Sequence, residues 1–400
     1  MALHTFFLIG GNCPRSRVDA QTIFDYFLKN GLIPVKKIKK ADIICIYTCG
    51  GFNETEESSI KTIKVILQKK SKNATVIVTG CLIKINPESM NIFNDIKMID
   101  FDNLEQLDEI IHSKITFKQI PNPGIVGRIH PLYNKKIKKL FYSYIRPNLT
   151  INISYHLNYI KNIYFKKNNK INTEDIYHIR ISQGCLGSCS YCSIKIARGY
   201  LQSKPIEQIK KDFEVGLKKG YKIFKLIGED IGCYGFDIKT NIIEILKIFF
   251  NLPGKNKIII TDFNPQWFVK YYDQLEPILI ANHKKILSFA IPIQSGSNNI
   301  LTRMRRRYKI EEVKSYMSKL LEKIPDLKIR THIIVGFPGE TDEDFQQTLN
   351  LLKEIQFFSV DIFPYSDRAV TDAFKMKKKI SSHIIQKRIK QIKMMDISIE

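Results

Sequence analysis

The sequence Cys185-Leu-Gly-Ser-Cys189-Ser-Tyr-Cys192 places three cysteines in a Cys-x-x-x-Cys-x-x-Cys pattern. Thiolates are the usual ligands of iron–sulfur clusters, and three of them can hold three corners of a cubane cluster. The fourth iron would then have no protein ligand, so it would be free to bind a substrate or a cofactor. The spacing therefore predicts a catalytic iron–sulfur site at Cys185, Cys189 and Cys192.

Zinc and disulfide bonding are the alternatives for these cysteines. Zinc normally takes four Cys or His ligands in pairs, but the only nearby histidine, His178, lies upstream in an apolar alternating run. Disulfide frameworks are typical of small secreted domains, whereas this chain is long and shows no apolar secretory signal. The shortage of zinc ligands and the length of the chain favour the iron–sulfur interpretation.

The composition predicts a protein with a large core. The chain has 400 residues, of which 44% are hydrophobic, enough for two or three domains. Apolar runs such as Phe6–Ile9 and Ile258–Ile260 have the length of strands and are far too short to cross a membrane. We therefore expect a cytoplasmic protein with no membrane partner.

The formal net charge of +24 indicates a polyanionic partner, because neutralised phosphates release condensed counterions. The chain is also rich in Lys, Ile and Asn together, a bias that would add lysines whether or not a nucleic acid is bound. Charge alone leaves nucleic-acid binding open.

The first hundred residues are typical of a small open α/β sheet. Helical periodicity covers Asp19–Leu28 and Glu56–Gln68, and it alternates with three short apolar runs expected to form buried parallel strands: Thr5–Ile9, Ile43–Tyr47 and Val76–Val78.

A cysteine follows each of these strands: Cys13, Cys49 and Cys81. Ligand sites of such sheets gather beyond the carboxyl ends of the strands, so three loops would bring these thiols together. The pattern favours a second cluster site over three unrelated buried thiols. Cys45, inside its strand, and Cys233, in a Gly-rich loop, are interpreted as packed or loop-borne thiols.

Beyond position 173, strand-like runs alternate with helical stretches. They predict an open, partial (β/α)6 barrel with its working loops at the strand carboxyl ends, where the Cys185 motif follows the first strand. The six expected strands are Tyr177–Ser182, Ile223–Ile227, Lys257–Thr261, Leu287–Ile293, Lys328–Val335 and Ser359–Phe363.

Four blocks, in this order, resemble the radical S-adenosylmethionine (AdoMet) methylthiotransferases, and together they span most of the chain. The blocks are the three dispersed N-terminal cysteines, Gly184–Cys192, Ile291–Ser297 and Ile334–Thr341. The resemblance implies two [4Fe-4S] clusters and AdoMet as cofactors, and a methylthio group placed on an unactivated carbon. It assigns AdoMet cleavage to the cluster at Cys185, Cys189 and Cys192, and the transferred sulfur to a cluster at Cys13, Cys49 and Cys81.

The resemblance also implies AdoMet contacts on the strand-end loops: Tyr191, Gly228, Glu229, Gln294, Ser295 and Gly336. Simpler interpretations remain open for each of them. Tight βα turns need glycine for steric reasons, Glu229 could belong to an ordinary acidic loop, and Tyr191 could only shield the cluster.

Two stretches suggest different substrates. Ala197–Pro205 and Glu229–Asp237 are similar to the branch that modifies threonylcarbamoyladenosine in tRNA, whereas Cys13–Asp19 and Thr48–Phe52 look like the branch that modifies a ribosomal protein. We expect the substrate carbon to be C2 of a hypermodified tRNA adenosine next to the anticodon. The alternative is a peptide or protein side chain. In either case an electron donor such as flavodoxin or ferredoxin is implied.

The expected domains are an N-terminal methylthiotransferase domain (1–115), a linker (116–172), the radical AdoMet barrel (173–374) and a basic helical tail (375–400). Family members usually end in a small β-barrel, the TRAM domain, for which this tail is too short and too poor in alternating strands. Within the linker, Tyr133–Lys170 has nine Lys or Arg, several aromatic rings and no Asp or Glu. This segment suits either RNA contact or a plain linker.

Two other classes of protein remain to be distinguished from a methylthiotransferase. A binding protein with structural clusters would need neither an open iron nor Glu229. A radical AdoMet enzyme without sulfur transfer would not need Cys13, Cys49 and Cys81.

Overall fold

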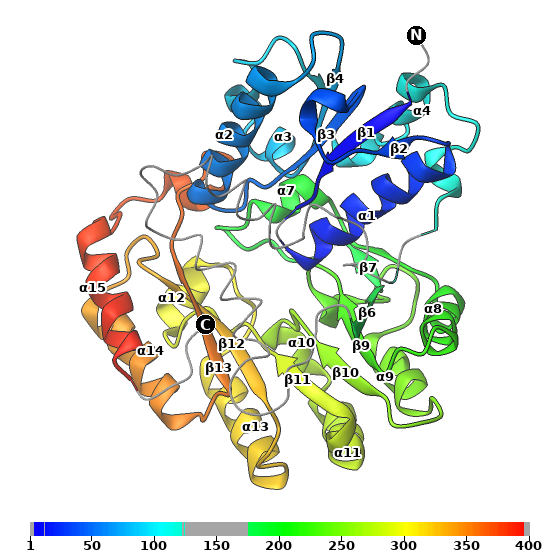
Figure 1. The fold of residues 1–400 in the computed structure, drawn as a ribbon. Coiled ribbons are helices and arrows are strands. Elements are labelled where there is room, and N and C mark those ends of the chain that lie inside the picture. The colour runs from blue at the N-terminus through cyan, green and yellow to red at the C-terminus, as the bar shows by residue number, and fades with distance from the viewer. Residues whose placement is uncertain (1–3, 12, 122–123, 125–174, 396–400) are drawn as a thin grey trace. The chain divides into compact units, whose positions relative to one another are not determined.

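The computed structural model describes residues 4–11, 13–121, 124 and 175–395 (Figure 1). The chain divides into two compact units, one of Met1–Glu174 with Ile196–Arg198 and the other of Asp175–Lys195 with Gly199–Glu400. The basic aromatic segment Tyr133–Lys170 lies outside the described residues.

The N-terminal unit is built on a parallel sheet with the strand order β2-β1-β3-β4-β5, which confirms the predicted open α/β sheet. Two of its strands were not predicted, because each has only two residues, all exposed, and so lacks an apolar pattern. The strands are β1 (Thr5–Ile9), β2 (Ile33–Pro34), β3 (Ile43–Thr48), β4 (Thr75–Gly80) and β5 (Lys97–Met98).

Helices of this unit connect the parallel strands. The first, α1 (Pro14–Lys29), begins earlier than its apolar periodicity predicted, because Cys13 caps it and Pro14 suits the first helical position. The others are α2 (Asn53–Lys69), α3 (Leu82–Ile85), α4 (Gln106–Ile111) and the short turns η1 (Ile38–Lys40), η2 (Glu88–Met90), η3 (Phe101–Asn103) and η4 (Phe117–Gln119).

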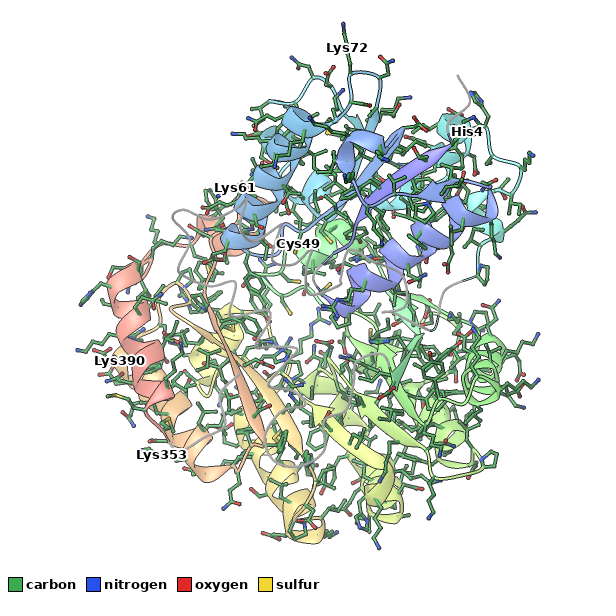
Figure 2. All side chains as sticks on the ribbon, viewed as in Figure 1. His4, Cys49, Lys61, Lys72, Lys353 and Lys390 are labelled. Carbon is green, nitrogen blue, oxygen red and sulfur yellow. The ribbon has the colours of Figure 1, made fainter. Side chains whose placement is uncertain are left out.

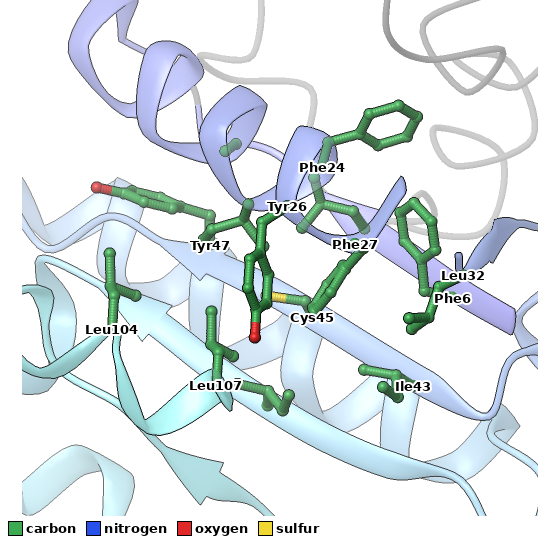
Figure 3. Packing of buried hydrophobic residues seen from close by; sticks show 14 of the residues in the cluster. Phe6, Phe24, Tyr26, Phe27, Leu32, Ile43, Cys45, Tyr47, Leu104 and Leu107 are labelled. Carbon is green, nitrogen blue, oxygen red and sulfur yellow. The ribbon is translucent and has the colours of Figure 1, made fainter. Parts of the chain in front are cut away.

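Strand β3 is buried on both faces, and its side chains alternate between two apolar clusters. Ile43, Cys45 and Tyr47 pack with α1 residues such as Tyr26 (Figure 3). Ile44 and Ile46 join the cluster that holds residues of α2 and α3. Cys45 is fully buried, and burial raises the pKa of its thiol to about 12, in agreement with its interpretation as a packed thiol.

The C-terminal unit contains a six-stranded parallel sheet with the order β13-β12-β11-β10-β9-β6. Each successive strand is added beside the previous one, as a (β/α) barrel requires, so the predicted fold class is confirmed. The strands are β6 (Ile176–Arg180), β9 (Ile223–Ile227), β10 (Lys257–Ile260), β11 (Ile286–Ala290), β12 (Ile329–Val335) and β13 (Ser359–Pro364).

A short antiparallel pair, β7 (Ser182–Gln183) with β8 (Gln202–Ser203), closes the long loop after β6. This loop includes α7 (Ile194–Arg198), whose last three residues group with the N-terminal unit. The remaining helices are α8 (Ile206–Lys218), α9 (Ile242–Phe250), α10 (Pro265–Lys270), α11 (Tyr272–Asn282), α12 (Asn298–Arg303), α13 (Ile310–Lys323), α14 (Asp342–Glu354) and α15 (Ser382–Lys393), with the turns η7 (Ile231–Cys233), η8 (His283–Lys285) and η9 (Asp372–Lys375). Among the described residues we find no helix with the length and apolar character needed to span a membrane.

The basic tail contains α15, which is anchored by one buried cation. Arg388 Nη1 lies 2.6 Å from Glu340 Oε2, and its Nη2 lies 2.8 Å from Asp342 Oδ1. Ile385 of the same helix packs against Gly336, where an added Cβ would lie only 2.3 Å from the Ile385 side chain. The tail is therefore an integral part of the unit, docked on the loop after β12.

We expect Arg388→Met to destabilise the protein by about 3 to 5 kcal/mol, because Glu340 would remain buried without its cation. The exposed Lys390 on the same helix provides the control, and Lys390→Met should stay within about 0.5 kcal/mol of the parent. Thermal or urea unfolding followed by circular dichroism measures both. Equal stability of the two variants would contradict the anchoring role of Arg388.

Candidate functional site

Cys185, Cys189 and Cys192 lie on the loop that β7 and β8 close. The loop starts at Gly184, whose φ of +73° suits glycine and where an added Cβ would lie 2.0 Å from the Tyr200 carbonyl oxygen. It turns at Cys192, whose N–H donates to the Cys189 carbonyl at 3.2 Å. One short segment thus presents all three thiols.

Hydrogen-bond donors are directed at two of these sulfurs. The Gly187 N–H donates to Cys185 Sγ at 3.1 Å, and Arg306 Nη1 donates to Cys189 Sγ at 3.5 Å. Lys195 Nζ binds the Gly187 carbonyl at 2.7 Å and so braces the turn between the two cysteines. Such donors stabilise thiolates, which suits ligands of an iron–sulfur cluster.

The thiols differ in how readily they ionise. The pKa of Cys185 is lowered, chiefly by a hydrogen bond from the Cys233 thiol, which outweighs the effect of burial. Burial raises the pKa of Cys192 to about 11. Cys192 would therefore bind as a thiolate only when a metal displaces its proton.

Cys233 has more contacts than the sequence indicated. It lies in η7, and its ligand atom, that of Asp230 and that of Cys185 are all within 4.8 Å of one another. Its Sγ also lies 3.0 Å from the Asp230 carbonyl oxygen, a second acceptor for the single thiol proton. The interpretation as a thiol that is merely packed or loop-borne missed this contact, because the contact joins loops after two different strands.

Asp230 anchors the loop after β9. Burial raises the pKa of its carboxyl to about 6, although Trp267 Nε1 donates to it at 2.9 Å. The neighbouring Glu229 accepts a hydrogen bond from the Gly184 N–H at 2.8 Å, so its carboxylate is held at the start of the cysteine loop. Gly228 is packed closely, since an added Cβ would lie 2.7 Å from Ser182 Oγ. The structure thus brings Gly228 and Glu229 to the cysteine loop.

Gln294 and Ser295 have clear structural roles. Gln294 has a φ of +75°, and its backbone bonds to both His332 and Ile334 of β12. Ser295 is buried, and its Oγ accepts from the Ser297 N–H at 3.2 Å.

Gly336 and Tyr191 lie in equally packed surroundings. The Gly336 N–H donates to Glu340 Oε2 at 2.8 Å, and its φ is +81°. Tyr191 packs in an apolar cluster with Phe337 and Met304. These contacts account for all four residues as scaffold, and contact with a cofactor remains a proposal for each.

Arg306 is a site residue that the sequence did not single out. Besides Cys189, it donates from Nη2 to the Pro292 carbonyl at 2.8 Å and lies 5.3 Å from the centre of the Tyr308 ring. It stands in the run Arg305-Arg306-Arg307, which in so basic a chain looks like any solvated charge cluster. Only the fold brings this one guanidinium to a cysteine.

The N-terminal unit holds the second set of thiols at the carboxyl ends of its strands. Cys13 caps α1 and accepts from the Ser16 N–H at 3.4 Å. Cys49 follows β3 (Figure 2), and its N–H donates to Ser59 Oγ at 3.0 Å. Cys81 follows β4 and donates its N–H to the Thr48 carbonyl at 3.1 Å.

These three thiols act on one another electrostatically. The pKa of Cys49 is raised and that of Cys81 is raised to about 12, chiefly by burial, and the charge of Cys13 contributes to both shifts. Burial has the same effect on Cys13, but the Arg15 charge, a hydrogen bond from Ser16 and the Arg198 charge outweigh it, so its pKa is lowered. Three convergent thiols with an electropositive neighbour form a donor set that suits an iron–sulfur cluster.

Comparisons with known families agree with this division of the chain. A family model described as the Radical SAM superfamily matches residues 179–352, which contain the Cys185 loop. A model described as uncharacterized protein family UPF0004 matches residues 5–101, which contain Cys13, Cys49 and Cys81.

Relatives with named activities align over most of the chain. A probable threonylcarbamoyladenosine tRNA methylthiotransferase of Pyrococcus abyssi is 31% identical over 91% of this chain and 77% of that protein. A threonylcarbamoyladenosine tRNA methylthiotransferase of Thermotoga maritima, MtaB, is 30% identical over 95% of this chain and 80% of its own length. A ribosomal protein uS12 methylthiotransferase of Natranaerobius thermophilus, RimO, is 30% identical over 96% and 80%.

A solved structure shows the same fold. The radical S-adenosylmethionine methyltransferase TsrM from Kitasatospora setae matches with a TM-score of 0.58 and 11% identity, over 91% of this chain and 75% of that one.

Alanine substitutions at two glycines with positive φ can test whether close packing of the cysteine loop is needed for iron binding. Gly184→Ala should disrupt the loop and lower the bound iron, because the new Cβ would meet the Tyr200 carbonyl. Gly220→Ala is the matched control, since its φ is +84° but nothing lies within 4 Å of an added Cβ. Gly220→Ala should be destabilised by only about 1 to 2 kcal/mol of backbone strain and should bind as much iron as the parent. Iron analysis after anaerobic reconstitution compares them, and equal iron in both variants would refute the steric argument.

Proposed function

Because the chain belongs to the radical AdoMet methylthiotransferases, we propose that it places a methylthio group on C2 of a hypermodified adenosine in tRNA, next to the anticodon. It is an enzyme of the radical AdoMet class. The observation that carries the proposal is the presence of two separate three-cysteine sets, one on three strand-end loops of the N-terminal sheet and one on the single loop after β6.

We assign the radical chemistry to the C-terminal set. Cys185, Cys189 and Cys192 would hold a [4Fe-4S] cluster, which when bound supplies the electron that cleaves AdoMet. The Gly187 N–H and Arg306 stabilise the thiolates that hold it. Glu229 is held by the Gly184 N–H, so its carboxylate is available to accept hydrogen bonds from the AdoMet amino group at a fixed place.

We also propose AdoMet contacts for the remaining strand-end residues and for Tyr191. Gly228, Gln294, Ser295 and Gly336 would supply backbone groups and shape at the strand ends, and Tyr191 would border the cofactor. Their packed surroundings support a rigid cofactor shelf, because each is held by hydrogen bonds or close contacts to its own unit.

We assign sulfur delivery to the N-terminal set. Cys13, Cys49 and Cys81 would hold a second [4Fe-4S] cluster whose fourth iron has no protein ligand and can carry the sulfur that becomes the methylthio group. Cys81 is buried and Cys13 and Cys49 are partly buried, which supports this role because it limits the access of water and oxidants to a reactive sulfur.

The choice of substrate rests on two observations. The chain is strongly basic, and relatives named for tRNA modification align over most of its length. Relatives named for a ribosomal protein align with similar identity, so a peptide or protein side chain is the alternative. Flavodoxin or ferredoxin is the proposed kind of electron donor.

Replacing Cys13, Cys49 and Cys81 by Ala should abolish methylthio transfer and leave AdoMet cleavage intact, because the two cysteine sets belong to separate units. Mass spectrometry of the product and quantification of 5′-deoxyadenosine measure the two steps. A matched Cys45→Ala variant should retain both, since Cys45 lies within β3 and its side chain packs in the apolar core. Methylthio transfer by the triple variant would exclude the assignment of sulfur delivery.

The substrate is tested by incubating the reconstituted protein with AdoMet, reductant and either total tRNA or cellular peptides. We expect a methylthio mass gain on a tRNA adenosine. A gain on peptide alone would instead establish the protein-modifying alternative.

A further inference from the structure

Arg198 is a buried cation that belongs to the N-terminal unit although it follows the C-terminal cysteine motif in sequence. It is the last residue of α7, and with Ile196 and Ala197 it groups with the unit that contains Cys13, Cys49 and Cys81. Its side chain is 2% exposed. A charge this deeply buried is costly, so its retention calls for compensating partners.

The partners of Arg198 hold its guanidinium in one orientation. Nη2 lies 2.8 Å from Asp19 Oδ2 and donates to the Tyr47 hydroxyl at 3.0 Å. The Asp19 side chain is also only 2% exposed. The Tyr47 hydroxyl in turn donates to Asp19 at 2.8 Å, and the guanidinium lies 4.2 Å from the centre of the Phe101 ring. The cation is therefore fixed on several sides.

Each element around Arg198 also positions one of the three thiols. Asp19 is on α1, the helix that Cys13 caps. Tyr47 is on β3, two residues before Cys49. Ala197, the neighbour of Arg198, packs against Cys81 in a small buried cluster.

The charge of Arg198 acts on all three thiols. It lowers the pKa of Cys13, Cys49 and Cys81 alike, although burial is the largest influence on each. The charge of Arg198 acts on the whole set, whereas that of Arg15 acts on Cys13 and that of Asp19 on Cys81.

We propose that Arg198 is a positioning residue that raises the reduction potential of the cluster held by Cys13, Cys49 and Cys81, and that Asp19 moderates this effect. The inference rests on the auxiliary cluster of the proposed function. Reduction adds one electron to a buried, thiolate-bound cluster, and a fixed cation nearby stabilises the added negative charge. Asp19 offsets part of that field while holding the guanidinium in place.

We expect the reduction potential to shift in opposite directions in Arg198→Met and Asp19→Asn. Arg198→Met removes the cation, so the potential should become more negative. Arg198→Lys keeps the charge and should restore most of the shift. Asp19→Asn removes the opposing carboxylate and should make the potential more positive.

The measurement is an EPR-monitored dithionite titration of the anaerobically reconstituted full-length chain. Cys185, Cys189 and Cys192 are replaced by Ala in every sample, so that only the auxiliary cluster contributes to the signal. Lys64→Met is the control for net charge: it removes one exposed cation on α2, whose field water and salt screen, and it should leave the potential unchanged.

If Arg198 had a purely structural role, Arg198→Met would lower the iron content but leave the reduction potential of the remaining cluster unchanged. Equal potentials for Arg198→Met and the parent, or shifts of the same sign for Arg198→Met and Asp19→Asn, would overturn the proposal. If Arg198→Met assembles no cluster, Asp19→Asn decides: a potential that is not more positive than that of the parent would overturn the proposal.

Failure of the proposed function is distinguishable from failure of this inference. A parent sample that binds no iron through Cys13, Cys49 and Cys81 would remove the auxiliary cluster, and with it the role of Arg198. If the cluster assembles normally but its reduction potential is the same with and without Arg198, only the role of Arg198 is overturned.

Discussion

The cost of burying thiolates is the constraint on which the rest of this structure depends. A cysteine binds iron only after it has lost its proton, and burial opposes that loss at Cys49, Cys81 and Cys192. The protein counters the cost with donors and cations placed close to the sulfurs. The Gly187 N–H and Arg306 donate to sulfurs directly, and the charge of Arg198 favours the thiolates of Cys13, Cys49 and Cys81.

Both units solve this problem with the same architecture. Parallel sheets bring loops from separate strands to one edge, where backbone N–H groups and helix starts are available to polar ligands. In the N-terminal unit the three thiols come from three loops, and Cys13 also caps a helix. In the C-terminal unit one loop supplies all three thiols, and the neighbouring strand ends contribute Glu229 and Asp230 around it.

The two arginines show how cations reach the sulfurs from distant parts of the chain. Arg306 follows α12, and Arg198 ends α7, yet each guanidinium is fixed beside a cysteine set by hydrogen bonds to its own unit. An arginine suits this task because it stays charged when buried and offers several donors in a rigid plane. The surroundings of both cysteine sets thus include a few buried charges as well as apolar packing.

Local sequence patterns by themselves determined much of this protein. Apolar runs of strand length predicted β1, β3, β4 and the six strands of the larger sheet, because buried parallel strands require continuous apolar sequence. Cysteine spacing singled out Cys185, Cys189 and Cys192, and the position of Cys13, Cys49 and Cys81 after expected strands singled out the second set. The tertiary structure alone decided the contacts between segments far apart in sequence: Cys233 beside Cys185, Arg306 beside Cys189, and Arg198 paired with Asp19. In a chain with 63 Lys and Arg no local pattern distinguishes such a cation from a solvated one, because its role depends on which distant loop the fold brings beside it.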